Sequence, residues 1–274
     1  MKKIILFIFA TSLGLSVWAQ DSTASKKNNP KNTNDRDRKT EKRQRINAMI
    51  KQEEEGNLSF RKQTAFGIQL RTDGYGGFFE LGRRKSPRFT NTYSLEITEI
   101  KHRKEEKSNS VENLFSSSFI YGKINNFYQV KLGFGQQYIL GQKGNKNGVA
   151  VLGIVQGGID LGLLKPYYLH IQDSANNERT ISYYDDPQSF VFPVQIFGSG
   201  GLGKGWNQLK MKPGLYLKTA LRFDFGRYNE TIQALEIGMS LEAFSQKIPI
   251  MVFNDAKQLF YQGHIAFVFG SRKK

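Results

Sequence analysis

The chain of 274 residues contains no cysteine, which excludes disulfide bonds, thiol catalysis and a thiolate metal site and argues against a lipoprotein anchor. It carries 40 Lys and Arg against 24 Asp and Glu, a formal net charge of +16. Such a charge favours nucleic acid as a partner only in a compartment that contains it. Because the start of the chain predicts export, nucleic acid is not an expected partner, and anionic lipid, lipopolysaccharide or cell-wall polymer takes its place.

Residues 1–19 have the pattern of a cleavable signal peptide. Two lysines precede an apolar stretch from Ile4 to Val17, and Ala19 provides the small residue at a cleavage site before Gln20. The alternative, an uncleaved transmembrane anchor, is disfavoured because the apolar stretch is short for a spanning helix. We therefore divide the chain into a signal peptide (1–19), an extension (20–60) and a main domain (61–274).

The extension, residues 20–60, combines a basic low-complexity tail with a short charged helix. From Gln20 to about Arg45 almost no apolar side chains occur, so this part cannot bury enough surface to fold. Between about Glu41 and Gly56 the pattern favours a helix that Gly56 would end. We expect the extension to lie in the periplasm as a solvated tether. The alternatives are a plug at the barrel mouth and a binding segment for an envelope protein or cell-wall polymer.

The main domain is predicted to be an all-β, antiparallel transmembrane barrel, because apolar and polar side chains alternate with a period of two. The clearest run sets Leu215, Leu217 and Leu221 against Lys218 and Arg222, so that one face suits lipid and the other suits water. Eight more stretches follow the same rule, at residues 66–71, 79–81, 93–98, 115–121, 128–134, 149–163, 235–243 and 259–269.

Strand length separates a barrel from a soluble sandwich. The longer stretches cover roughly 9 to 15 residues, enough to cross a bilayer when tilted, and the aromatic content of 13% fits interfacial girdles. A soluble sandwich would have shorter strands packed against a second sheet. With a further strand near Tyr167 the count is about ten, and eight or twelve are also compatible. A barrel of this size is normally filled by its own side chains.

Turn length predicts the orientation, because such barrels keep short turns in the periplasm and long loops outside. The short links at residues 122–125 and 226–229 are therefore expected in the periplasm. The longer connections at residues 102–113, 141–147 and 248–256, and most of residues 172–212, are expected to face outward.

The candidate functional residues form a polar cluster on the predicted lumen side: Lys218, Arg222, Glu236, Glu242 and His264. Pairing of the two cations with the two glutamates across neighbouring strands explains the four charges structurally. The alternatives are a polar pathway through a narrow channel and a lipid hydrolase centred on His264. The three histidines have no ligand spacing, so neither a metal nor a cofactor is expected.

The glycine-rich segment from Gly198 to Gly205 matches GxGxxG and nearly matches a phosphate-binding loop. Gly205 stands where a magnesium-binding hydroxyl is needed, and Pro213 follows too soon for a long helix. We therefore predict a turning loop without a nucleotide.

Several features spread over most of the mature chain carry a resemblance to a known family. They are Ala19-Gln20 at the cleavage site, the charged helix before the barrel, Arg71-Thr72-Asp73-Gly74-Tyr75-Gly76, Leu161-Gly162-Leu163-Leu164-Lys165-Pro166-Tyr167-Tyr168 and Ala234-Leu235-Glu236-Ile237-Gly238. With them the chain resembles exported outer-membrane β-barrel proteins of the Bacteroidetes type, a family without an assigned activity. The ending differs from that of common barrels, because five residues follow Phe269. The resemblance implies an integral outer-membrane protein and supplies no catalytic residue. We therefore expect a non-enzymatic structural or accessory envelope component that engages partners through its outer loops or its tail.

Overall fold

The computed structural model describes residues 40–44, 46–47, 60–109, 118–145, 147–173, 175–201 and 203–273. Residues 40–44 and 46–47 are helical and belong to a unit separate from the rest. The predicted signal peptide, the low-complexity tail up to residue 39 and the remainder of the predicted helix lie outside the described residues. Among the described residues, no helix is long and apolar enough to span a membrane.

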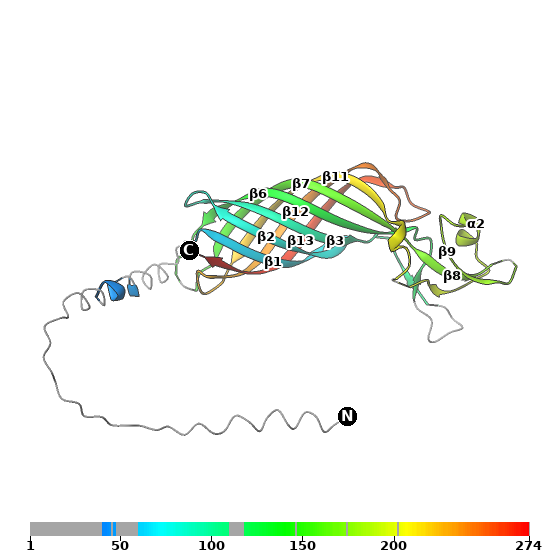
Figure 1. Ribbon diagram of the computed structural model, residues 1–274, viewed down its shortest axis with the longest axis horizontal. Coiled ribbons are helices and arrows are strands. Elements are labelled where there is room, and N and C mark those ends of the chain that lie inside the picture. The colour runs from blue at the N-terminus through cyan, green and yellow to red at the C-terminus, as the bar shows by residue number, and fades with distance from the viewer. Residues whose placement is uncertain are drawn as a thin grey trace, which may run out of the picture. The chain divides into compact units, whose positions relative to one another are not determined.

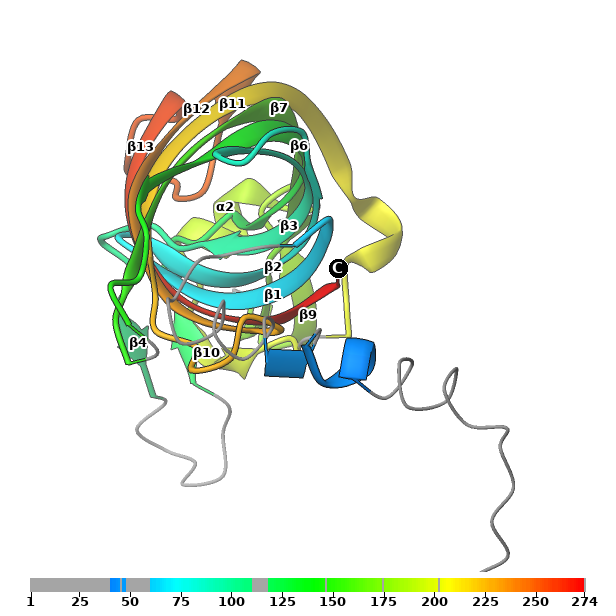
Figure 2. The ribbon, with the colours of Figure 1, turned by 90° about the vertical axis from the view of Figure 1, so that its left-hand side faces the viewer.

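The second unit is built around one closed antiparallel barrel of eight strands, in the order β1-β13-β12-β11-β7-β6-β3-β2. Figure 1 shows the strands from the side, and Figure 2 shows the ring that they form. The ring closes where β1 pairs with β13, for example Phe66 with Phe269. The strands are β1 (Lys62–Arg71), β2 (Gly74–Arg84), β3 (Phe89–Ile100), β6 (Asn125–Gly141), β7 (Ala150–Pro166), β11 (Lys210–Asp224), β12 (Thr231–Ile248) and β13 (Lys257–Lys273).

The alternation in the sequence sets which side chains face outward. On β11, Leu215 and Leu217 are 66% and 52% exposed, whereas Lys218 and Arg222 are 4% and 2% exposed. Since successive strand residues point to opposite faces of a sheet, this burial follows from a period of two. The prediction of an all-β antiparallel barrel is confirmed.

The expected count of about ten strands is wrong, and eight is the observed number. Of the predicted stretch at residues 115–121, the described part contributes only β5 (Phe119–Ile120), which pairs with β4 (Lys107–Ser108). The segment near Tyr167 forms β8 (Tyr168–Gln172), which lies outside the barrel. Both short segments pair with local neighbours, so their alternation reflects small sheets in the connections.

The two ends of the barrel differ in their connections. One end, called the turn end, carries the connections 85–88, 142–149 and 225–230. The other, called the loop end, carries 72–73, 101–124, 167–209 and 249–256. The link at residues 122–125 therefore lies at the loop end, opposite to the link at 226–229, and residues 141–147 lie at the turn end. Both placements correct the sequence-based orientation, which counted a strand at residues 115–121.

The connection from β7 to β11 folds into a cap at the loop end, visible at the right of Figure 1. It contains β8, β9 (Glu178–Ser182), the helix α2 (Pro187–Val191), β10 (Gln195–Ser199) and the 3₁₀ turn η1 (Trp206–Gln208). Asp186 caps α2 by accepting the Ser189 N–H at 3.1 Å, and hydrogen bonds from Ser189 lower the pKa of this carboxyl. Leu169, Ile171 and Phe190 give the cap an apolar core of its own.

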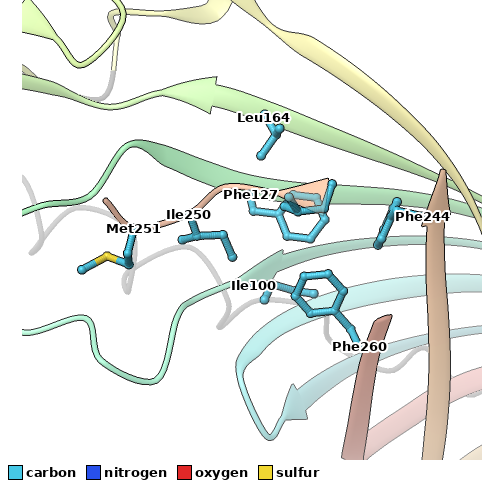
Figure 3. Close-up of a cluster of buried hydrophobic side chains, with 8 residues drawn as sticks. Ile100, Phe127, Leu164, Phe244, Ile250, Met251 and Phe260 are labelled. Carbon is cyan, nitrogen blue, oxygen red and sulfur yellow. The ribbon is translucent and has the colours of Figure 1, made fainter. Parts of the chain in front are cut away.

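Clusters of buried apolar side chains lie in the lumen toward both ends. At the loop end the rings of Phe127, Phe244 and Phe260 lie with centroids 5.4 to 5.8 Å apart, and Ile250 and Met251 of the β12–β13 connection pack against them (Figure 3). Toward the turn end two further clusters fill the lumen. They comprise Ala65, Phe78, Ile232, Ala234, Ala266 and Val268, and Phe60, Ile139, Ala150 and Leu152.

Candidate functional site

The five residues singled out in the sequence all lie inside the barrel, between the apolar clusters. Lys218 and Arg222 come from β11, Glu236 and Glu242 from β12 and His264 from β13. Each is 5% exposed or less. Neighbouring strands in a closed barrel direct alternate side chains to one lumen, which brings these residues together.

Glu236 is the centre of one group. Lys218 Nζ lies 2.8 Å from its Oε1, Arg222 Nη2 lies 2.7 Å from its Oε2, and His264 Nε2 lies 3.2 Å from its Oε1. Arg222 also reaches Glu80 across the lumen, with Nη1 and Nη2 each 3.0 Å from a carboxylate oxygen. A bidentate guanidinium–carboxylate pair fixes both side chains in one orientation.

Glu242 belongs to a second group, which corrects part of the predicted pairing. Its cationic partners are Arg71 and Lys131 rather than Lys218 or Arg222, with Lys131 Nζ at 2.6 Å. Gln129 Nε2 donates to Glu242 Oε2 at 2.9 Å. On β11 the residue paired with Glu242 is Tyr216, so the cations that meet this carboxylate come from other strands.

Glu96 joins the two groups. It lies 3.1 Å from Lys131 Nζ, 3.7 Å from Arg71 Nη1 and 3.9 Å from Lys218 Nζ. Sequence reasoning left Arg71, Glu80, Glu96 and Lys131 out of the cluster, although all four stand at inward positions of their strands. The period of two in the sequence could have identified these four positions as inward-facing. It could not identify their partners, because contacts across the lumen depend on how the strands close into a ring.

Asp160 is the exception in this network. Its side chain is fully buried and lies beside Lys131 in the β6–β7 register, yet neither carboxylate oxygen has a hydrogen-bond partner among the described residues. Leaving a buried charge without partners is costly. Without Asp160, the four carboxylates of Glu80, Glu96, Glu236 and Glu242 balance four cations, Arg71, Lys131, Lys218 and Arg222.

A separate charged group closes the turn end. Asp224 pairs with Arg272, and Lys143 of the β6–β7 connection lies 3.6 Å from Asp224 Oδ1. Lys143 Nζ also donates to the carbonyl of Gly226. Burial lowers the pKa of Lys143, and the Asp224 carboxylate opposes that shift.

The chemistry available to the lumen follows from these contacts. The cations and four of the five central carboxylates hold one another, and apolar clusters lie beyond them on both sides. His264 faces Glu236 in the lumen, so the arrangement needed for a lipid hydrolase, with this histidine facing lipid, does not occur. Among the described residues, no group of three or more His, Asp or Glu side chains is placed to hold a metal ion.

The prediction of a turning loop from Gly198 to Gly205 is right only in part, because Gly198 and Ser199 end strand β10, whereas residues 200–201 and 203–205 lie in no strand or helix. Gly201 and Gly205 adopt positive φ values of 89°, which glycine accommodates without strain. The 3₁₀ turn η1 that follows has only three residues, Trp206–Gln208.

The chain matches no protein-family model and no curated protein. Among solved structures it is similar to Neisserial surface protein A, with 8% identity and a TM-score of 0.38, covering 78% of this chain and 96% of that one. It is also similar to Ail, the attachment invasion locus protein of Yersinia pestis. One Ail structure is a complex with the heparin analogue sucrose octasulfate (9% identity), and another gives 10% identity. Both have a TM-score of 0.34 and cover 78% of this chain and 99% of that one. Values this low do not transfer a function.

Proposed function

We propose that this chain is an integral outer-membrane protein with a closed barrel, acting as a non-enzymatic envelope component that presents its loop-end cap to partners. One observation carries the proposal: the outer face of all eight strands is apolar and exposed, while the lumen is charged and filled. Leu70, Leu215 and Met211, for example, are 64% to 67% exposed. A soluble monomer rarely exposes so large an apolar surface, whereas a membrane barrel requires it.

The distribution of loops supports the orientation. The two longest connections, 101–124 and 167–209, both lie at the loop end, and long loops face outside in outer-membrane barrels. The turn end, where β1 begins and β13 ends, then faces the periplasm. The predicted signal peptide and the resemblance to Bacteroidetes-type barrels point to the same compartment, and we place the extension of residues 20–60 in the periplasm.

The proposed partners follow from charge and location. A chain of net charge +16 favours polyanions, and in this compartment these are lipopolysaccharide, anionic lipid and cell-wall polymers. An envelope protein or cell-wall polymer bound by the basic tail remains part of the proposal, and nucleic acid does not.

Planar-bilayer conductance of the refolded protein tests the closed lumen against the narrow channel considered above. We expect no steady conductance, because ion-paired side chains and apolar clusters fill the path. The same protein without residues 20–56 is the matched control, since it isolates any contribution of the extension. Reproducible channel steps in the intact protein would contradict the closed lumen, and steps found only after truncation would identify the extension as a plug.

A further inference from the structure

A pocket of about 440 Å³ opens on the outer face of the barrel wall at the loop end. Outward-facing residues of four strands line it: Tyr75 of β2, Glu99 of β3, Tyr128 of β6 and Lys165 of β7. The cap and its approach add further lining residues, among them Tyr167, Tyr168 and Lys204. The pocket therefore lies between the barrel wall and the cap, separate from the lumen network.

Positive charge dominates the pocket, because its lining has five lysines and two glutamates. Glu105 is neutralised by Lys123, whose Nζ lies 2.8 Å from Glu105 Oε2. Glu99 accepts a hydrogen bond from Tyr75 Oη at 2.5 Å. Within the described residues, none of Lys101, Lys107 and Lys204 forms an ion pair with a carboxylate. These three ammonium groups are available to an anion.

Aromatic rings lie beside two of the lysines that line the pocket. Trp206 stacks on Tyr128 with ring centroids 5.8 Å apart, and Lys165 Nζ lies 4.6 Å from the Trp206 centroid. Lys101 Nζ lies 4.9 Å from the Tyr75 centroid. Lysines beside tyrosine and tryptophan are typical of the level at which lipid headgroups meet the hydrocarbon.

The apolar outer face begins directly below the pocket. The next outward-facing residue toward the turn end is apolar on each of three strands. It is Ile97 after Glu99, Val130 after Tyr128 and Leu163 after Lys165. Two strand residues span roughly 6.6 Å. An occupant anchored by the lysines therefore has a continuous apolar surface beside it, which favours a molecule with an anionic head and an apolar tail.

We propose that this pocket binds the phosphate-bearing headgroup of a membrane lipid in the leaflet at the loop end, with Lys101, Lys107 and Lys204 as its cationic contacts. The acyl chains lie along the outward faces of β3, β6 and β7. The inference rests on the proposed membrane location and names the lipid class that the site takes. Lysine ammonium groups suit phosphate as compact charges with several donors.

The test uses Trp206 as the reporter, since it is the only tryptophan left once the predicted signal peptide, which contains Trp18, is removed. The protein is inserted into phosphatidylcholine nanodiscs that contain a small fraction of phosphatidic acid brominated in its acyl chains. Brominated phosphatidylcholine at the same fraction is the reference. We expect phosphatidic acid to quench Trp206 with an apparent affinity about two- to tenfold higher, the range for two or three partly exposed ion pairs.

The matched pair of variants decides the assignment. Lys101→Gln with Lys204→Gln should lower the preference, and adding Lys107→Gln should abolish it. Lys247→Gln with Lys257→Gln should keep it, because these exposed lysines lie at the same end outside the pocket. Equal quenching by both lipids in the inserted parent, or equal losses in the two double variants, would overturn the inference. Failure of the parent to insert would instead overturn the proposed function.

Free phosphate is the other source of the same chemistry. Glycerol 3-phosphate added to the nanodiscs at millimolar concentration should leave the preference intact, because it lacks the apolar tail. Complete loss of the preference in its presence would overturn the lipid assignment and identify a soluble phosphate ester as the occupant.

Discussion

Leu217 and Lys218 are neighbours on β11, yet one is 52% exposed on the outer face and the other is 4% exposed in the lumen. The outer face consists mostly of apolar side chains that pack against apolar neighbours on the adjacent strands, as the rings of Phe66 and Phe269 do with centroids 6.0 Å apart. The middle of the lumen contains charged side chains, most of them held by several partners at distances of 2.6 to 3.1 Å. The contribution of a lumen side chain to folding stability therefore depends on which side chains it contacts. The contribution of an outer side chain depends on whether lipid or water surrounds it.

The largest expected effect follows from removing the carboxylate at the centre of the lumen. Glu236→Gln leaves Lys218 and Arg222 without their shared partner, and breaking a buried ion pair costs about 3–5 kcal/mol. Urea unfolding in lipid vesicles would measure the loss. The control is Ile237→Ala, the next residue on the outer face, which should cost much less. Equal losses would remove the distinction between the two faces.

A charge placed on the outer face should have an effect that depends on depth. Leu217 lies at the middle of β11, so Leu217→Arg should cost about 2–4 kcal/mol of folding free energy, whereas Met211→Arg near the loop end should cost about 0–1 kcal/mol. The same unfolding assay measures both. Equal costs at the two depths would show that no hydrocarbon layer surrounds this face.

Adding a methyl group to one inward-facing and one outward-facing glycine compares the two faces by volume instead of charge. A Cβ at Gly133 would overlap the hydroxyl of Tyr216 inside the lumen, whereas at Gly157 its nearest atom is the Tyr216 carbonyl oxygen at 3.4 Å. We expect Gly133→Ala to cost about 1–3 kcal/mol and Gly157→Ala to be tolerated. Unfolding midpoints of the two variants would check this, and the reverse order would contradict the packing described for Tyr216.

The smallest expected effect is at Asp160. Because its carboxylate makes no hydrogen bond to any residue that the structure describes, Asp160→Asn removes an excess negative charge without breaking a pair, and stability should be unchanged or higher. The contrasting variant is Glu242→Gln, which breaks contacts to Arg71 and Lys131 and should destabilise. A large loss on Asp160→Asn, measured by the same urea unfolding, would mean that this carboxylate is needed to balance Lys131.

Part of this structure was accessible from the sequence. The alternation around Leu217 and Lys218 predicted which side chains face outward and which face the lumen, because successive residues of a strand point to opposite faces. The strand count was not accessible, because short segments such as β5 and β8 alternate as the barrel strands do. The partners of Glu242 and the pocket at Lys101 and Lys204 depend on contacts between strands distant in sequence, which local patterns do not contain.

The central claim is that the outer face of the barrel meets lipid while the lumen is filled, and the absence of native cysteine makes it directly testable. Single substitutions Leu215→Cys, Leu217→Cys and Leu221→Cys on the outer face, with Tyr216→Cys and Ala220→Cys in the lumen, would carry a nitroxide label in vesicles. The account predicts that collisions with dissolved oxygen alternate with a period of two, high at the three outer positions and low in the lumen, with little access for a water-soluble nickel reagent at any of the five. High access of the nickel reagent at the outer positions would contradict the account.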